Sequence, residues 1–249
     1  MCLHGFMDTW RSWELVLPAL QRKHDVLALT LAGHAGGPSL EGEPSVAALA
    51  DAVEREMDAA GLAPAHIAGS SLGGYLALRL AARGRALSVV AFAPAGGLPP
   101  GDPSWRDLLE LQYQLQLQAR ALAPRVDAIL ATAEGRRRAT ELLTVNFDHI
   151  PTELLAHQLL AVANCPAAPA LIEHARGDVW MLDAEAIACP VRIVWGTADR
   201  LLAWPQAAAR YRDQWLPHAD WVVLDGVGHY PQFDVPVEAA QLILGFTGG

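Results

Sequence analysis

A serine bracketed by two glycines lies where an apolar run gives way to a helix-forming stretch. Residues 67–77 read IAGSSLGGYLA, and Ser71 is centred between Gly69 and Gly73. A sharp turn from strand to helix would aim the Ser71 hydroxyl outward, and side chains at the two glycine positions would collide where strand and helix pass closely. The motif therefore predicts a strand beginning near residue 65, a turn at Ser71 and a helix over residues 72–83.

Two further polar residues follow apolar, strand-like segments later in the chain. Residues 191–200 read VRIVWGTADR and end in a turn that carries Asp199, and residues 221–231 read WVVLDGVGHYP and deliver His229 from a glycine-rich loop. A serine hydroxyl is a poor nucleophile at neutral pH and needs a base that is itself oriented by an acid. Ser71, His229 and Asp199 are therefore the candidate catalytic residues. The alternative acids are Asp225, Asp178 and Asp183.

The three motifs follow one another along the chain in the order serine, acid, histidine. In these motifs and their order, the chain resembles the α/β-hydrolase family. A His-Gly-Phe segment at residues 4–6, followed by Trp10 and Trp13, is similar to the family's oxyanion loop. The resemblance implies that the backbone N–H groups of Phe6 and Leu72 hold the oxyanion and that water releases an acyl group from Ser71. It also implies that His4 holds the loop and does not transfer protons in catalysis.

Alternating strand and helix patterns predict the fold class α/β, a mostly parallel sheet with helices on both faces. Strand-like segments cover residues 25–31 and 86–93, and helical spacing covers residues 12–22, 46–61, 205–215 and 237–246. The alternation stops between residues 94 and 188, where the sequence resembles the family's helical cap. We expect a core formed by residues 1–93 and 189–249, with a cap at 94–188. Residues 111–118 fit both the alternating pattern of a strand and the spacing of a helix, and their composition favours a helix.

A cap inserted at this point would cover the Ser71 site. Its aromatic residues are candidates for lining an apolar substrate-binding pocket, with ordinary core packing as the alternative for each. These candidates are Trp105, Tyr113, Phe147 and Trp180.

The start of the chain departs from the family pattern. The resemblance implies two antiparallel strands and most of a third before His4, where this sequence has only Met1, Cys2 and Leu3. The third strand would lie centrally, between residues 25–31 and 65–69, and its neighbour would present an open edge. By this resemblance, we expect the family's N-terminal strands to be missing. We expect either an internally assigned chain start or a shortened enzyme that covers the edge as a homodimer.

Composition narrows the classes of partner and location. A net charge of −9 argues against nucleic acid and anionic membrane surfaces as partners. The chain has no run of 18 apolar residues and no signal-peptide pattern. Its three cysteines are widely spaced and form no metal-binding pattern. We expect a cytoplasmic enzyme that acts on a small molecule without a cofactor or a metal.

The resemblance implies a carboxylesterase (EC 3.1.1) for small to medium apolar acyl groups. Serine at position 71 argues against the haloalkane dehalogenase and epoxide hydrolase branches, whose attack forms an ester on a carboxylate. Three alternatives keep the same three residues: a hydrolase of carbon–carbon bonds in ring-cleavage products, a cofactor-free haloperoxidase-like enzyme, and a non-catalytic ligand-binding protein on the same fold.

Overall fold

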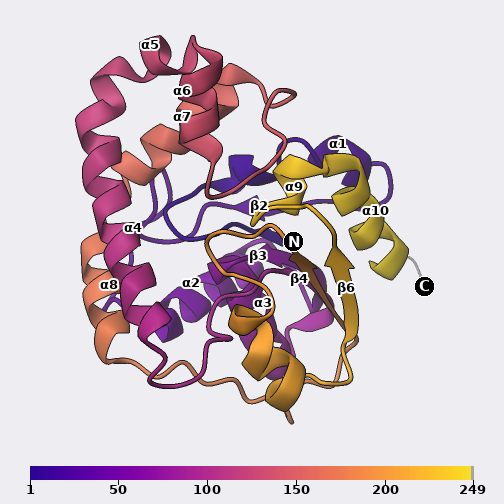
Figure 1. Ribbon diagram of the computed structural model, residues 1–249. Helices are drawn as coiled ribbons and strands as arrows, with labels where there is room; N and C mark the ends of the chain where they lie inside the picture. Colours follow the sequence, from indigo (N-terminus) through magenta and orange to yellow (C-terminus); the bar gives the residue numbers. More distant parts are fainter. Residues whose placement is uncertain (248–249) are drawn as a thin grey trace.

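The computed structural model describes residues 1–247 as one parallel sheet surrounded by helices (Figure 1). The strands lie in the order β2-β1-β3-β4-β5-β6, and every pairing is parallel. The predicted fold class is confirmed. The strands are β1 (Cys2–Leu3), β2 (Ala28–Leu29), β3 (Ala65–Ser70), β4 (Ala86–Phe92), β5 (Val191–Gly196) and β6 (Asp220–Leu224).

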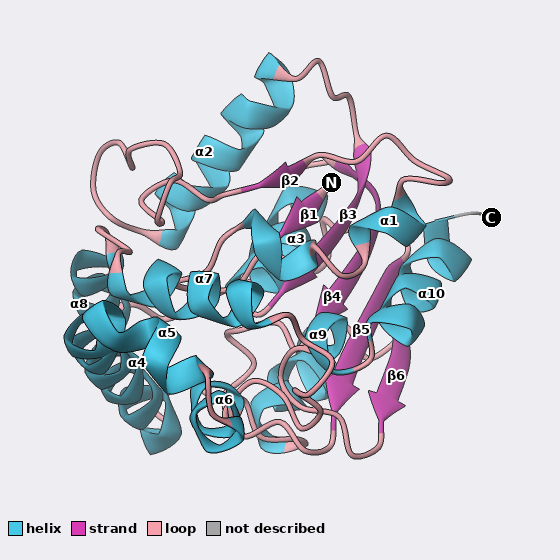
Figure 2. Cartoon of the chain, turned by 90° about the horizontal axis from the view of Figure 1, so that it is seen from above, coloured by secondary structure: helices cyan, strands magenta, loops and turns pink. Residues whose placement is uncertain are grey.

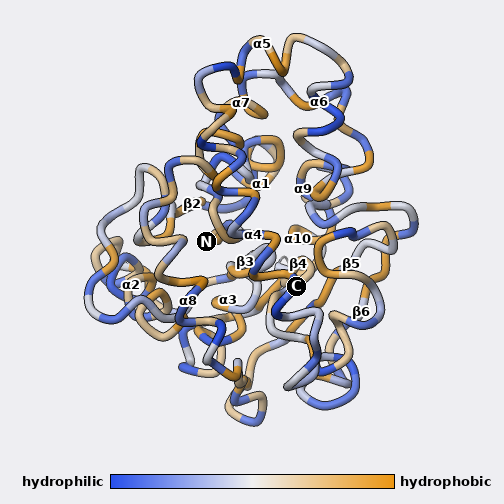
Figure 3. The backbone as a smooth tube through the Cα atoms, turned by 60° about the vertical axis from the view of Figure 1, so that its left-hand side comes forward, coloured by the Kyte–Doolittle hydropathy of each residue, from blue (hydrophilic) through white to orange (hydrophobic). Residues whose placement is uncertain are grey.

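Helices cover both faces of the sheet (Figure 2). One apolar cluster packs α2 (Val46–Ala59) and α3 (Leu72–Ala82) on the first face, and a second packs α1 (Leu17–Leu20) and α10 (Pro236–Thr247) on the opposite face. Successive side chains of a strand point to opposite faces. In β4, Val89 therefore joins the first cluster and Val90 the second. Hydrophobic stretches accordingly concentrate in the central strands (Figure 3).

Several helices lie between β4 and β5 in the chain. They form a layer beside the sheet, with α4 running along one side of it (Figure 1). Residues 111–118 lie within α4, so the helical interpretation of this segment is correct. The helices are α4 (Pro103–Leu122), α5 (Val126–Leu130), α6 (Ala133–Thr140), α7 (Thr152–Ala163) and α8 (Ala168–Gly177). A short helix, α9 (Pro231–Asp234), follows β6.

Three elements predicted from the sequence are shorter or divided in the structure. The helix expected over residues 12–22 is divided into a 3-10 turn at Trp10–Trp13 and α1, because Pro18 has no N–H to continue a preceding helix. The strand expected over residues 25–31 is reduced to β2, since β1 offers it only two pairing residues. The helix expected over residues 205–215 is a 3-10 turn at Gln206–Ala208 and a π turn at Tyr211–Trp215.

No single helix within residues 1–247 is long and apolar enough to cross a membrane. Helices α7 and α8, bent by 63° relative to each other, meet the length and composition requirement only as a pair.

The fold requires a residue without a side chain at position 73, and a substitution of Gly73 tests this requirement. A Cβ there would lie 2.3 Å from the Leu3 carbonyl oxygen and 2.5 Å from that of His4, and backbone atoms cannot move aside cheaply. We expect Gly73→Ala to lower the free energy of unfolding by more than about 2 kcal/mol. Gly245→Ala is the matched control, because that exposed glycine of α10 has no atom within 4 Å of a new Cβ. Gly245→Ala should raise the free energy of unfolding by up to about 1 kcal/mol. Urea denaturation measures both, and equal effects would contradict the steric argument.

Candidate active site

Ser71 occupies a strained backbone position between β3 and α3. Its φ of 54° and ψ of −117° lie in a region that residues other than glycine rarely adopt. The surrounding backbone holds this conformation: Ser71 N–H donates to the Phe92 carbonyl at 2.8 Å, and the Ser71 carbonyl accepts from Ala95 N–H at 3.0 Å. Gly69 allows the turn to be tight, because a Cβ there would lie 2.2 Å from the Gly73 carbonyl oxygen. The serine side chain is thereby fixed at the start of a helix.

His229 and Asp199 form a buried pair. His229 Nδ1 lies 2.7 Å from Asp199 Oδ2, and both side chains are inaccessible to solvent. The other carboxylate oxygen of Asp199 accepts the N–H groups of Leu201 and Leu202 at 2.9 and 2.7 Å. With Nδ1 donating to Asp199, the neutral imidazole carries a lone pair on Nε2.

The structure distinguishes among the candidate acids by their partners. Asp225 accepts the Thr197 hydroxyl at 3.0 Å, and Asp178 lies 3.9 Å from His174 Nε2. Asp183 is exposed. Asp199 is therefore the carboxylate that the fold places on His229.

His229 Nε2 is buried and has no hydrogen-bond partner among residues 1–247. The structure therefore contains no hydrogen bond between it and the Ser71 hydroxyl, although both residues line the same pocket. Among residues 1–247, no group of three or more His, Cys, Asp or Glu side chains is arranged to hold a metal ion.

The loop that contains Phe6 passes directly over Ser71. A Cβ on Gly5 would lie 3.3 Å from the Ser71 Cβ and 2.3 Å from the Tyr230 hydroxyl. His4 anchors this loop: its Nδ1 donates to the Gly5 carbonyl at 2.7 Å, and its Nε2 accepts Leu31 N–H at 2.9 Å. Burial, together with the nearby His34, lowers the pKa of His4 well below its ordinary value, so its ring is neutral. Leu72 begins α3, where the first N–H groups have no partner within the helix.

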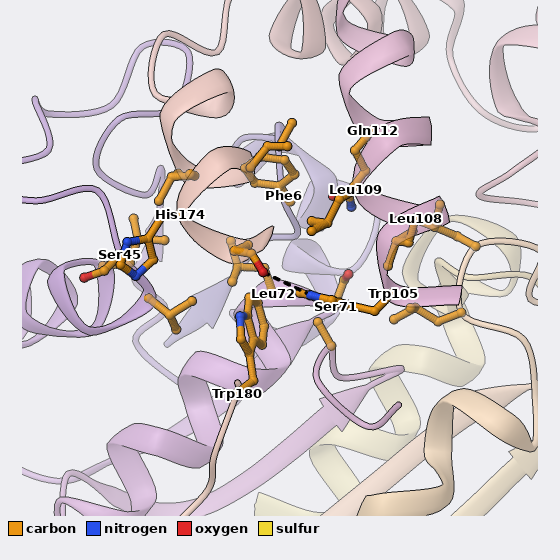
Figure 4. Close-up of a pocket in the computed structure, with 18 residues that line it drawn as sticks. Phe6, Ser45, Ser71, Leu72, Trp105, Leu108, Leu109, Gln112, His174 and Trp180 are labelled. Atoms are coloured by element: carbon orange, nitrogen blue, oxygen red, sulfur yellow. Dashed lines mark hydrogen bonds between the residues drawn. The ribbon is translucent and has the colours of Figure 1, made fainter. Parts of the chain in front are cut away.

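Two pockets meet at Ser71. The tryptophan pocket, named for Trp105 and Trp180, has a volume of about 600 Å³, which includes space open to solvent (Figure 4). The histidine pocket, named for His229, is larger at about 1320 Å³. Trp105 and Trp180 pack edge to face, with ring centroids 5.1 Å apart. Of the predicted substrate-binding residues, these two line the tryptophan pocket. Tyr113 packs with Leu109 and Ile172, and Phe147 packs in the cluster around Leu130; neither residue lines either pocket.

The sequence analysis missed Asp8, which lies in the wall of the histidine pocket. The residue is 2% exposed, and its Oδ1 accepts Thr9 N–H at 2.6 Å and Gln158 Nε2 at 2.7 Å. Burial raises the pKa of Asp8 to about 7, and these hydrogen bonds oppose the rise. Nothing in the local sequence separates a buried aspartate from an exposed one, because its burial comes from a helix 150 residues away.

The raised pKa of Asp8 predicts a pH-dependent stability. The folded state keeps a proton on Asp8 that an unfolded chain, with a pKa near ~4, has already released. The stability that this proton contributes is complete below pH ~4 and is lost as the pH rises through about 7. Between pH 5 and pH 8, the free energy of unfolding of the wild type should therefore fall relative to that of Asp8→Asn. Urea denaturation of both proteins at several pH values measures this change. Parallel pH curves would contradict the raised pKa.

Comparison with known proteins places the chain among hydrolases. Residues 1–242 match the model of the "Alpha/beta hydrolase family". The chain is 34% identical over 214 residues to "Epoxide hydrolase EphH" of Mycobacterium tuberculosis, covering 81% of this chain and 94% of that protein. It is 27% identical over 258 residues to the "Pimeloyl-[acyl-carrier protein] methyl ester esterase" of Neisseria meningitidis serogroup B, covering 99% and 92%.

Solved structures agree on the fold. The enol-lactonase of Burkholderia xenovorans superimposes with a TM-score of 0.73 at 20% identity, covering 100% of this chain and 90% of that one. The thermophilic esterase of Thermogutta terrifontis gives 0.70 at 21% identity, covering 98% and 87%. With the parallel sheet and the matched residues 1–242, these findings establish that the chain is a member of the alpha/beta hydrolase family.

Proposed function

We propose that this hydrolase is a serine carboxylesterase that cleaves esters of small to medium apolar acids through an acyl-enzyme on Ser71. The observation that carries the proposal is the buried His229–Asp199 pair, whose free Nε2 lines the same pocket as the strained Ser71. A nucleophile, a base and an oriented carboxylate are the parts that acyl transfer requires.

In this mechanism His229 Nε2 removes the Ser71 proton as the hydroxyl attacks the ester carbonyl. The backbone N–H groups of Phe6 and Leu72 hold the negative oxygen of the tetrahedral intermediate. His229 then gives the proton to the departing alcohol, and Asp199 stabilises the imidazolium throughout. A water molecule, deprotonated by His229, releases the acid from Ser71.

The relative named as an epoxide hydrolase raises a second candidate activity. Attack of a serine hydroxyl on an epoxide would leave an ether on the enzyme. Unlike an ester, an ether has no carbonyl for water to attack, so the enzyme would be trapped after one turnover. Ser71 therefore favours ester cleavage. Sustained hydrolysis of styrene oxide that disappears in Ser71→Ala would reverse this preference.

The nucleophile assignment is tested by Ser71→Ala against Ser70→Ala, its neighbour in the chain. Loss of such a serine costs about a million-fold in turnover, or about 8 kcal/mol in the barrier. Hydrolysis of p-nitrophenyl butyrate should fall accordingly in Ser71→Ala and persist in Ser70→Ala. Intact mass after treatment with a serine-directed phosphonate should show one adduct on the wild type and on Ser70→Ala. An adduct on Ser71→Ala would refute the assignment.

The acid assignment is tested by comparing Asp199→Asn with Asp225→Asn. The first variant keeps the shape of the side chain but favours the wrong imidazole tautomer, and turnover should fall roughly ten-thousand-fold. The second removes a carboxylate that contacts Thr197, so turnover should stay close to that of the wild type. Steady-state kinetics with p-nitrophenyl butyrate measure the turnover of both variants. An inactive Asp225→Asn with an active Asp199→Asn would move the acid to Asp225.

A further inference from the structure

The side-chain amide of Gln112 lies where the two pockets meet at Ser71. Of the four residues that line both pockets, Ser71 and Gln112 have polar side chains, and Phe6 and Leu201 are apolar. Gln112 extends from α4 toward Ser71 (Figure 4). It therefore lies beside the carbonyl carbon of an ester bound at Ser71, whichever pocket receives the acyl chain.

Gln112 interrupts an apolar stripe on α4. The α4 residues in the two pocket walls recur at intervals of three and four, which places them on one face of the helix. Gln112 occupies the middle of this stripe, and Gln118, its other polar member, is exposed. An amide on an apolar face needs a partner, because its removal from water costs free energy. The apolar members are Trp105, Leu108, Leu109, Leu115, Ala119 and Leu122.

The protein gives the Gln112 amide no hydrogen-bond partner among residues 1–247, unlike two other glutamines of α4. One turn further along the helix, the buried Gln116 donates from Nε2 to the Cys165 carbonyl at 2.7 Å. Gln114 donates to Glu110 at 2.9 Å on the exposed side of the helix. Gln112 is half-buried and lines both pockets, so its amide is available to a bound molecule.

Other polar side chains in the wall of the tryptophan pocket already lie next to groups of the protein. Ser45 Oγ accepts a backbone N–H of α2 at 3.1 Å. His174 has Glu43 Oε1 3.5 Å from its Nδ1 and Asp178 Oδ2 3.9 Å from its Nε2. Apart from Ser71, Gln112 is therefore the residue of this wall whose side chain is free to bind a polar group of the substrate.

A purely hydrocarbon acyl chain would leave this amide without partners. Such a chain displaces the water that a half-buried amide binds in solution, and an unpaired donor or acceptor costs more free energy than one hydrogen bond contributes. A hydroxyl group on the second or third carbon of the acyl chain lies within three bonds of the carbonyl carbon. It can accept from the amide N–H or donate to the amide oxygen, so it removes this cost.

We propose that Gln112 selects esters whose acid carries a hydroxyl group on the second or third carbon of an otherwise apolar chain. This rests on the ester hydrolysis proposed above and changes none of its steps. The acyl group stays on Ser71 after the alcohol has left, so a contact with it acts in both the formation and the hydrolysis of the acyl-enzyme. A contact with the alcohol would act only in the first half.

Two pairs of esters with matched shapes test this preference. Methyl 3-hydroxyoctanoate and methyl 3-methyloctanoate differ by a hydroxyl in place of a methyl group of similar size, and the corresponding 2-substituted esters form the second pair. We expect kcat/KM for the hydroxy ester to exceed that for its methyl counterpart by about tenfold or more in at least one pair. Ratios near one in both pairs would overturn the proposal while leaving ester hydrolysis intact.

Gln112→Met separates the contribution of the amide from the intrinsic reactivity of the esters. Methionine keeps the length of the side chain but is only a weak acceptor, so the ratio of hydroxy to methyl ester should fall about tenfold. Hydrolysis of methyl octanoate should rise severalfold in the same variant, because no amide then loses its water to the hydrocarbon chain. A fall in methyl octanoate hydrolysis would show instead that Gln112 supports catalysis, and it would overturn the proposal.

Gln114→Met is the matched control, because this exposed glutamine of the same helix binds Glu110 and lines neither pocket. It should keep the wild-type ratio of hydroxy to methyl ester. If Gln112→Met does not fold, Gln112→Leu removes the amide at the same position. A ratio that stays at the wild-type value without the amide would refute the assignment to Gln112.

Binding to Ser71→Ala gives a readout that does not depend on catalysis. Calorimetry with the same pairs of esters measures their dissociation constants, and we expect the hydroxy ester to bind about tenfold more tightly. Adding Gln112→Met in this background should remove that advantage. A hydroxyl preference in binding without ester turnover by the wild type would refute the esterase proposal but support the Gln112 site. Turnover by the wild type with equal binding of both esters would refute the Gln112 site alone.

Discussion

The close approach of α3 to the loop after β1 is the constraint on which the rest of the site depends. Gly73 lies so near the carbonyl groups of Leu3 and His4 that no side chain fits between them. This contact brings the start of α3 beneath the loop that contains Phe6, and it fixes Ser71 in a conformation that a free chain would avoid. The strain is sustained because the sheet and the helix hold both sides of the turn, through Phe92 and Ala95.

Two buried aspartates, Asp199 and Asp8, lie near the candidate site. The carboxylate of Asp199 is inaccessible to solvent, but it accepts hydrogen bonds from two backbone N–H groups and faces His229. Asp8 is buried to a similar extent, and burial raises its pKa to about 7 although hydrogen bonds from Thr9, Gln158, Tyr230 and Ser12 oppose the rise. The two aspartates thus have different partners: Asp199 contacts His229, and Asp8 contacts Gln158.

The helices between β4 and β5 contact the loop that contains Phe6. Gln158 of α7 binds Asp8, and the neighbouring His157 binds the Thr9 hydroxyl at 2.7 Å. These contacts connect α7 to the loop that contains Phe6. Gln116 of α4, which is buried, donates to the Cys165 carbonyl at 2.7 Å and links α4 to the segment between α7 and α8.

The sequence by itself determined the parallel α/β architecture, the strand–turn–helix around Ser71 and the order of its partners, because strand alternation and turn glycines are local signals. It could not determine the lengths of β1 and β2, which limit each other by pairing. It also could not show that Asp8 is buried, that Tyr113 and Phe147 pack away from both pockets, or that two pockets diverge from Ser71. These features arise from contacts between segments far apart in the chain, and burial and pocket shape exist only after those segments have packed.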